Sequence, residues 1–262
     1  MNECLISGYT LPEAYHQALV ALNRYGVISD CEYQDTKTRQ KELPMTFYVG
    51  NPLAEPMISR LWIGGAYDLE RYRQEMLNGV LDKMIGHGWD YTYHDRMHRF
   101  PQSVSHGYWC CEKDQVKFVV DELKRCPNSR RAVISLRSNE DMNIFATDPA
   151  CLQHIQYFIR DGKLHCKVLF RSNDAVEATF MNAFALVLLQ KQIADELGVE
   201  MGSYTHRANS FHAYEKDWKL LDSYVKRIES GENLTYDYEG EFDEMMEEAR
   251  PDVEKLVDQL GV

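Results

Sequence analysis

The sequence predicts an α+β fold in which a mixed β-sheet packs against helices. Segments with the helical period and segments with strand alternation follow one another without a regular βαβ rhythm, which disfavours a doubly wound fold. Residues 156–164 have the pattern of a strand, a tight turn and a second strand. Residues 177–197 are apolar almost all round and stop at Gly198, as expected of a central buried helix.

Two helices are predicted in the first third of the chain. Leu11–Tyr25 has an apolar face and follows Thr10, with Glu13 completing the pattern of a capping box. Asp68–Leu77 ends before Asn78-Gly79, where a glycine can adopt the left-handed conformation that closes many helices. Both helices are therefore expected to have defined ends.

Similar patterns predict the remaining elements. Asp114 is expected to cap a helix that Pro127 closes, because four apolar residues share one face of it: Val116, Val119, Val120 and Leu123. Strands are predicted at 45–49, 131–135, 164–170 and 203–214.

The C-terminal segment differs in charge. From Asp237 to Glu248 the chain carries seven acidic residues, and after Pro251 apolar residues recur on one helical face. We expect a solvated acidic linker followed by a short amphipathic helix that docks on the rest of the chain.

Composition and charge bound the function classes. With 262 residues, 44% of them hydrophobic, the chain can bury a sizeable core. Its net charge of −12 argues against DNA and anionic membranes as partners, although a local arginine cluster could still bind a small phosphate. The apolar stretch around Phe180–Leu189 is too short to span a membrane, and the first residues show no signal-peptide pattern. We therefore expect a cytoplasmic protein.

The cysteines indicate free thiols. They number seven, an odd count, and none is part of a CxxC pair. A disulfide framework or a zinc site is therefore not expected, and we predict no metal.

Cys151 is the first candidate for chemistry. It follows Pro149-Ala150, and Arg171 lies twenty residues later at the end of a predicted strand, next to Ser172. The intervening strands could bring the arginine back to the thiol, where its charge would favour the thiolate and bind a phosphate. A buried structural cysteine is the plainer alternative.

Two further polar pairs stand near predicted strands. Arg130 and Arg131 are either a second anion-binding pair or a solvated basic turn. His212 and Tyr214 alternate along a strand and so share one face, where they could bind a sugar hydroxyl. Either residue alone would more often be structural.

These residues together carry a resemblance to a known family. The stretch from Asp148 to Tyr214 resembles the core of the thymidylate synthase family, and most closely its short archaeal-type members, which carry similar Cys-Leu-Gln, Phe-Arg-Ser-Asn-Asp-Ala and Tyr-Thr-His segments. The run Asn128-Ser129-Arg130-Arg131 resembles a further motif of that family. The resemblance implies a thymidylate synthase-like fold and a sheet-mediated homodimer, with residues 1–235 as the catalytic domain and 236–262 as an acidic C-terminal segment.

The resemblance also implies roles for the residues around the thiol. Cys151 would add to C6 of a pyrimidine and make C5 nucleophilic. Arg171 and Ser172 would bind the 5′-phosphate, and Arg171 would also help activate the thiol. Arg130 and Arg131 would reach the phosphate of the neighbouring subunit, so that the active sites would be shared.

Further roles follow in the same way. Asp174 would order the nucleotide and a folate-like cofactor, and Tyr93 would match a tyrosine near the thiol. His212 and Tyr214 would hold the deoxyribose 3′-hydroxyl. Arg39 would match the N-terminal phosphate arginine of the family.

Asn182 is the predicted specificity residue. It lies eleven residues after Arg171, where synthases of this family carry asparagine and deoxycytidylate hydroxymethylases carry aspartate. A side-chain amide can accept from uracil N3–H and donate to O4, whereas cytosine presents the opposite pattern. An asparagine that merely caps or bends a core helix is the structural alternative.

The chain departs from the family pattern at the catalytic glutamate. Alignment on Leu61-Trp62 puts Ser59 at that position, which supplies no acid or base. Alignment on the helix that ends at Gly79 gives Glu70 as the general acid/base, with Glu55 as second choice. Two further departures are Leu152 after the nucleophile, in place of histidine, and the acidic C-terminus.

The predicted activity is a methyltransferase that converts dUMP to dTMP with 5,10-methylenetetrahydrofolate or a related methylene-pterin. One alternative is a hydroxymethylase, in which water attacks the exocyclic methylene and gives 5-hydroxymethyl-dUMP. A second is a non-catalytic regulator that binds a nucleotide or RNA on the same fold. A thiol hydrolase is disfavoured because no Cys-His-Asn set is evident.

Overall fold

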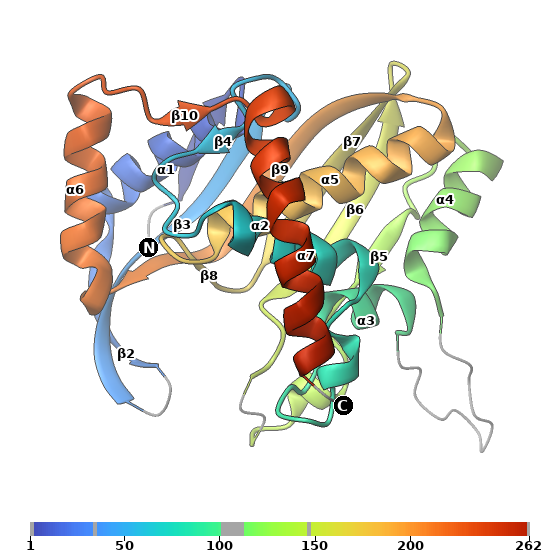
Figure 1. Ribbon diagram of the computed structural model, residues 1–262, viewed down its shortest axis with the longest axis horizontal. Coiled ribbons are helices and arrows are strands. Elements are labelled where there is room, and N and C mark those ends of the chain that lie inside the picture. The colour runs from blue at the N-terminus through green and yellow to red at the C-terminus, as the bar shows by residue number, and fades with distance from the viewer. Residues whose placement is uncertain (1–2, 34–35, 101–112, 146–147, 261–262) are drawn as a thin grey trace.

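A computed structural model describes residues 3–33, 36–100, 113–145 and 148–260. Within these ranges eight strands form one mixed sheet in the order β1-β3-β9-β7-β6-β5, with β2 paired to β3 and β8 paired to β9 (Figure 1). The strands are β1 Cys4–Gly8, β2 Val27–Tyr33, β3 Thr36–Val49, β5 Val133–Ser135, β6 Leu152–Arg160, β7 Lys163–Phe170, β8 Asn173–Asp174 and β9 Glu200–Tyr214. A separate pair joins β4 Ile58–Ser59 to β10 Thr235–Tyr236.

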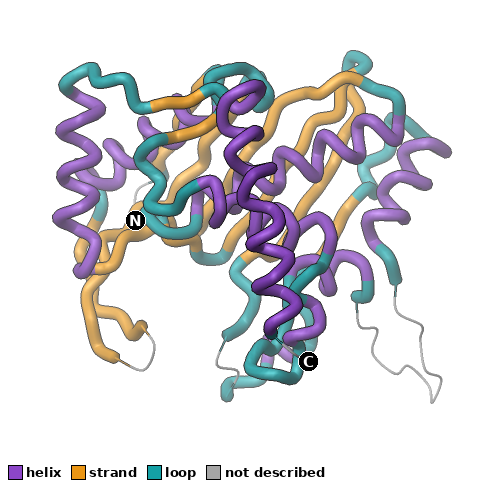
Figure 2. The backbone as a smooth tube through the Cα atoms, viewed as in Figure 1, coloured by secondary structure: helices purple, strands orange, loops and turns teal. Residues whose placement is uncertain are grey.

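The helices pack on the sheet, and Figure 2 shows those in the middle of the view crossing in front of the strands. They are α1 Leu11–Tyr25, α2 Ala66–Asn78, α3 Tyr93–His98, α4 Gln115–Arg125, α5 Thr179–Leu197, α6 Trp218–Glu229 and α7 Asp243–Gln259. Helices α1 and α5 pack directly on strands, α2 packs on α5, and α7 packs on α2. Helix α2 is thus held between the central helix and the C-terminal one.

The core confirms the prediction of a central helix. Phe180, Phe184 and Leu186 of α5 are fully buried, and Phe47 and Phe170 of the sheet are fully buried as well. Burial of such side chains is the main favourable term in folding. The mixed sheet with helices packed on it confirms the predicted α+β class.

Most predicted elements are present with small shifts at their ends. Thr10 accepts a hydrogen bond from the Glu13 backbone N–H at the start of α1. Gly79 ends α2 with φ of 64°, and Asp114 caps α4 by accepting from the Lys117 N–H. The strand predicted at 45–49 is the end of the longer β3, whose pairing with β9 shifts register around Pro44.

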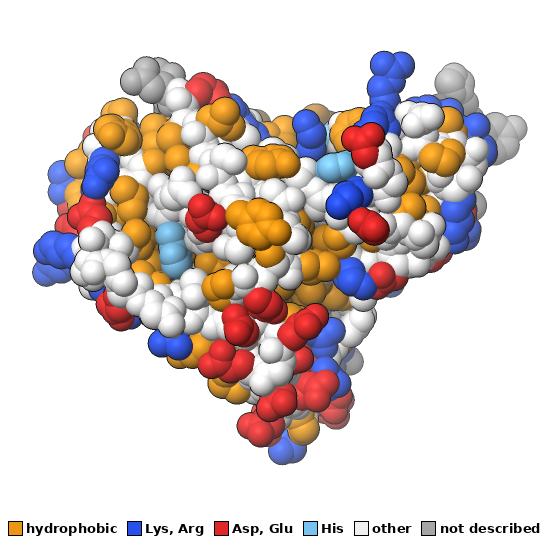
Figure 3. All heavy atoms as spheres, turned by 90° about the horizontal axis from the view of Figure 1, so that it is seen from above, with side chains coloured by type: hydrophobic (Ala, Val, Ile, Leu, Met, Phe, Trp, Pro, Cys, Tyr) orange, Lys and Arg blue, Asp and Glu red, His pale blue; other side chains and the backbone are white. Residues whose placement is uncertain are grey.

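The predicted acidic linker is wrong from Asp243 onward. Helix α7 begins there and continues through Pro251, because Met246 and Val253 are buried on one side and anchor it. Its exposed side carries Glu244, Glu247 and Glu248, and Figure 3 shows acidic side chains gathered on one part of the face in view. The division at residue 235 stays a prediction.

Among the described residues, every helix is too short or too polar to span a lipid bilayer.

Candidate active site

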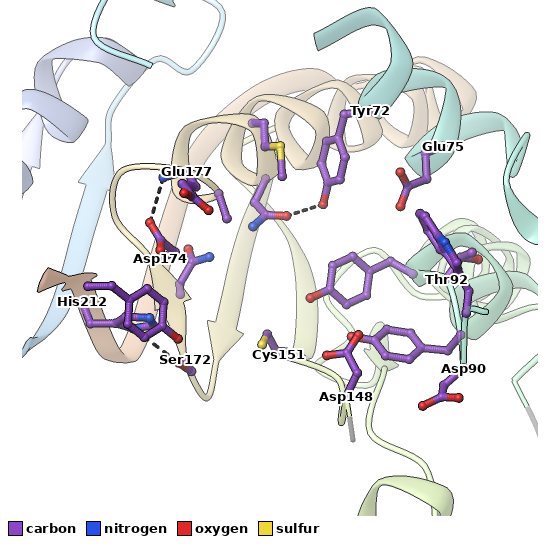
Figure 4. A pocket seen from close by; sticks show the side chains of 18 of the residues that line it. Tyr72, Glu75, Asp90, Thr92, Asp148, Cys151, Ser172, Asp174, Glu177 and His212 are labelled. Atoms are coloured by element: carbon purple, nitrogen blue, oxygen red, sulfur yellow. Dashed lines mark hydrogen bonds between the residues drawn. The ribbon is translucent and has the colours of Figure 1, made fainter. Parts of the chain in front are cut away.

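One cavity of about 610 Å³ lies between α2, α5, the turn before β6 and the ends of β8 and β9 (Figure 4). Figure 4 shows Tyr72 and Glu75 of α2 on one side and Ser172, Asp174 and His212 on the other, with Cys151 between them. Of the residues predicted from the sequence, seven line this cavity: Tyr93, Cys151, Ser172, Asp174, Asn182, His212 and Tyr214.

Cys151 sits at the start of β6 in a turn that Arg171 holds. The Arg171 guanidinium donates to the carbonyl oxygens of Pro149 and Ala150, at 2.5 and 3.0 Å, and its backbone N–H donates to the Cys151 carbonyl at 2.9 Å. Burial raises the pKa of the Cys151 thiol, Arg171 lowers it, and Asp148 raises it again. The net rise means that the thiol is protonated at neutral pH.

Tyr93 lies beside this turn, as predicted. Its hydroxyl oxygen accepts a hydrogen bond from the Leu152 N–H at 3.1 Å. Burial and the nearby Cys151 raise the pKa of Tyr93, so the phenol stays protonated and available as a donor. The Leu152 side chain is fully buried in the core and offers the cavity no polar group.

Asp174 and His212 meet at the opposite wall. Asp174 Oδ1 accepts from the backbone N–H groups of Val176 and Glu177, each at 2.8 Å, which fixes the turn into α5. Burial raises the pKa of the Asp174 carboxyl, although these two bonds and His212 oppose the rise. His212 Nδ1 lies 3.2 Å from the Ser210 carbonyl and 3.4 Å from Ser172 Oγ.

His212 has an unused nitrogen. Its Nε2 is buried and has no hydrogen-bond partner among the described residues. A buried polar atom without a partner is costly, so this atom is a candidate to bind a ligand group. The Tyr214 ring stands edge-on to the imidazole, with centroids 4.8 Å apart, so the predicted pair does share one face.

Asn182 projects from α5 into the cavity and is bound by a residue that the sequence did not single out. The Tyr72 hydroxyl donates to Asn182 Oδ1, and both side chains are largely buried. Tyr72 lies on α2, so this bond also links the two helices.

Glu75 is the second residue that the sequence analysis missed. It follows Tyr72 by three residues, which puts both side chains on the same face of α2, and it lines the cavity. Burial raises the pKa of Glu75 to about 7, against the charge of Arg71. The helical period relative to Tyr72 was the available signal, but nothing local showed which face of α2 meets the cavity.

Glu70 lies outside the cavity. Its side chain is fully buried and accepts hydrogen bonds from Arg73, Gln74 and Arg250, at 2.7, 2.9 and 3.1 Å. Burial would raise its pKa, but these three partners outweigh burial, and the pKa of Glu70 is lowered. Glu55, the second choice, accepts hydrogen bonds from the backbone N–H groups of Met57, Tyr238 and Glu239. It thereby ties the chain around residue 238 to the loop that precedes β4.

None of the four predicted arginines lines the cavity: Arg171 is bound to the backbone of the Cys151 turn, and the other three have different surroundings. Arg39 pairs with Glu215 and lies over the Trp218 ring, 5.2 Å from its centroid. Arg130 and Arg131 have exposed side chains just before β5. Their roles as phosphate ligands stay predictions.

The cavity wall is acidic. Five carboxyl side chains line it, and among its described lining residues there is no lysine or arginine: the five are Glu75, Asp90, Asp148, Asp174 and Glu177. Any compensating positive charge for an anionic ligand must therefore come from Arg171 beneath the turn or from outside this set.

The cavity brings together a thiol and an amide, which the sequence motifs implied, and the Glu75 carboxyl, which they did not. The family model described as thymidylate synthase matches residues 62–253. The chain belongs to the thymidylate synthase family. A protein of Methanocaldococcus jannaschii, provisionally named thymidylate synthase, is 30% identical over 222 residues, which cover 82% of this chain and 93% of that protein.

Other members agree with this assignment. A thymidylate synthase of Bacillus licheniformis is 31% identical over 157 residues, 56% of this chain and 55% of its own length. The structure of the thermostable thymidylate synthase A from Bacillus subtilis superimposes with a TM-score of 0.63 at 19% identity, covering 83% of this chain and 84% of that one. At that identity the likeness shows the fold, and the predicted thymidylate synthase-like fold is confirmed. Membership of this family supports an enzyme.

Proposed function

We propose that this chain is a thymidylate synthase that converts dUMP to dTMP, with methylenetetrahydrofolate or a related methylene-pterin as second substrate. The observation that carries the proposal is that Cys151, Asn182 and Glu75 line the same cavity. They supply a nucleophile, a group that matches uracil, and a carboxyl whose pKa is near neutrality.

Cys151 begins the proposed reaction. Its sulfur would attack C6 of the uracil, so that a C6–S bond forms and the C5=C6 electron pair moves toward C5 and O4 as an enolate. Because the thiol is protonated in the free protein, its proton must pass to solvent water in this step. Arg171, which already lowers the pKa of Cys151, would favour that loss.

Asn182 and Glu75 would act on the O4 side of the ring. The Asn182 amide would donate to O4 and stabilise the enolate as negative charge develops there. Glu75 would give a proton toward this side when the enolate forms and take it back when the enolate collapses. A pKa of about 7 suits both directions at neutral pH.

The nucleotide phosphate would need charge that the cavity wall lacks. Ser172, His212 and Tyr214 would bind the sugar and phosphate by hydrogen bonds, and Arg171 would supply one charge. The exposed positions of Arg130 and Arg131 fit a role at the phosphate of a partner subunit. The resulting assembly would be a homodimer with shared sites.

The proposed dimer would form through the sheet. Leu5 pairs with Thr46, and Tyr48 with Thr205, so these side chains share the sheet face opposite the helices. Leu5 is 77% exposed and Tyr48 is 40% exposed, which leaves apolar area on this face for a partner.

The cavity also suits a pterin. Trp89, Tyr91 and Met181 offer flat or polarisable apolar surface, and the Asp174 carboxyl can accept from amino and ring N–H groups. When bound, the methylene-pterin would supply the one-carbon unit and the hydride. Asp174 would orient it, and the aromatic side chains would keep water from the reacting carbon.

The test is mass identification of the product from purified protein, dUMP and methylenetetrahydrofolate, with Cys151→Ala as control. A methylated product from the wild type alone is the expected result. A hydroxymethylated product would support the role of Cys151 as nucleophile but would show that the hydride transfer does not take place. No product, together with no covalent adduct between Cys151 and 5-fluoro-dUMP, would favour the binding role instead.

A further inference from the structure

The Tyr72–Asn182 hydrogen bond determines which end of the amide faces the cavity. Tyr72 comes from α2 and Asn182 from α5, and their exposed fractions are only 7% and 5%. The phenol donates to Asn182 Oδ1, and Figure 4 draws the bond as a dashed line from Tyr72. No described residue accepts a hydrogen bond from Asn182 Nδ2, so this NH₂ group remains for a ligand.

Rotation of the amide by half a turn would be unfavourable. The NH₂ group would then face Tyr72, and the phenol oxygen would have to accept instead of donate. The Tyr72 proton would need another acceptor, and no described residue other than Asn182 accepts from this hydroxyl. A buried donor without an acceptor carries a substantial penalty, so the observed orientation is strongly preferred.

Tyr72 also cannot relieve this constraint by ionising. Burial raises the pKa of Tyr72 well above its usual value, and the neighbouring Tyr93 and Glu75 add to the rise. The hydroxyl therefore carries its proton throughout the neutral pH range.

We propose that Tyr72 is a specificity-determining residue that acts through Asn182, holding the amide so that it selects a pyrimidine with a 4-carbonyl group over one with a 4-amino group. This inference rests on the proposed function, because it assumes that a pyrimidine nucleotide binds beside Cys151. The outward NH₂ group donates to a carbonyl at C4. A 4-amino group would instead place two donors against each other, and Tyr72 prevents the amide from turning to avoid the conflict.

The test compares the binding of dUMP and dCMP to the wild type and to Tyr72→Phe by titration calorimetry. The substitution removes the hydroxyl and keeps the ring that fills the space between α2 and α5. We expect the ratio of the dCMP and dUMP dissociation constants, which measures the preference for dUMP, to be roughly 10-fold smaller in Tyr72→Phe than in the wild type. A change of this size corresponds to the net contribution of about one hydrogen bond. The change should consist of weaker dUMP binding and tighter dCMP binding together.

Asn182→Ala and the double variant separate positioning from packing. If Tyr72 acts through the amide, Tyr72→Phe should change the dUMP preference in the wild type but not in the Asn182→Ala background. Tyr15→Phe is the matched control, because it removes another buried phenol hydroxyl, which donates to the Ala175 carbonyl at 2.8 Å. That variant should leave the preference unchanged, and thermal unfolding of each variant reports whether it folds.

The possible failures differ. A wild type that binds dUMP selectively, with the same selectivity in Tyr72→Phe, would overturn the role of Tyr72 alone. Equal effects of Tyr72→Phe with and without Asn182 would also overturn it and leave only a packing role. A wild type that binds neither nucleotide would defeat the proposed function, and this inference with it.

Discussion

Glu70 and Glu75 lie five residues apart on α2 but face different surroundings. The Glu70 carboxylate is enclosed by Arg73, Gln74 and Arg250 between α2 and α7, whereas the Glu75 carboxyl lines the cavity. Five residues turn a helix by about 140°, so one helix supplies a structural carboxylate on one side and a titrating carboxyl on the other. Their pKa values move in opposite directions, down for Glu70 and up to about 7 for Glu75.

The first prediction concerns activity. Glu75→Gln keeps the shape of the side chain but cannot exchange a proton, so kcat for dTMP formation should fall about 10²- to 10⁴-fold. Glu70→Gln is the matched control on the same helix and should retain kcat per folded molecule. Steady-state kinetics with both variants checks this. Comparable loss of kcat in the two variants would argue that α2 matters only as a whole.

The second prediction concerns the stability of the free protein. The folded-state pKa of Glu75 is raised from 4.5 to about 7, so its contribution is most favourable below pH 4.5 and is lost as pH rises toward 7. Glu75→Gln escapes that loss and should be more stable than the wild type by up to about 3 kcal/mol at pH 8, with little gain at pH 4. Urea unfolding at the two pH values measures the difference. A gain that does not depend on pH would contradict the raised pKa.

Glu70 gives the opposite expectation. Its pKa is lowered on folding, so its contribution is present above the unfolded value of 4.5 and is lost as pH falls below it. Glu70→Gln should therefore lower the free energy of unfolding by about 2–3 kcal/mol at pH 7, where Arg73 and Arg250 lose a charged partner. The deficit should shrink in acid. Denaturant curves at pH 7 and pH 3.5 provide the comparison.

A fourth prediction follows from the protonated thiol. Burial and Asp148 keep the pKa of Cys151 above its usual value despite Arg171, so a small alkylating reagent should label Cys151 slowly at pH 7 and progressively faster as pH rises. Asp148→Asn removes the negative charge that raises the pKa of Cys151, so the pH dependence of the labelling rate should shift to lower pH. Mass spectrometry of the modified peptide measures the rate at each pH. A shift to higher pH would show that Asp148 helps the thiolate rather than opposing it.

The sequence predicted the parts of the site that follow one another along a strand or turn. Cys151, Ser172, Asp174 and His212 stand in the short motifs that carry the family resemblance, and all of them line the cavity. It did not predict Glu75, because periodicity shows which residues share a helix face but not what that face meets.

Other parts of the fold depend on contacts between distant segments. The helical state of α7 depends on Met246 being buried and on the contact between Arg250 and Glu70, 180 residues apart. The charge run alone therefore resembled a solvated linker. The first half of β3 was missed for a related reason: it pairs with β2 and has few buried residues to mark a strand.

The last prediction tests whether the sites are shared between subunits. A chain with Cys151→Ala lacks the nucleophile, and a chain with both Arg130→Ala and Arg131→Ala lacks the charges proposed for the partner's phosphate. Each should be nearly inactive alone.

If the arginines serve the partner, mixed dimers hold one site with all groups intact, and random reassortment after mild unfolding and refolding should restore roughly a quarter of wild-type activity. Arginines that served their own subunit would leave every mixed site with one defect, either the missing thiol or the missing arginines, so mixing would restore no activity. Arginines with no role at the phosphate would leave the double variant active before mixing, since the Cys151 thiol and the rest of the cavity wall are unchanged in it.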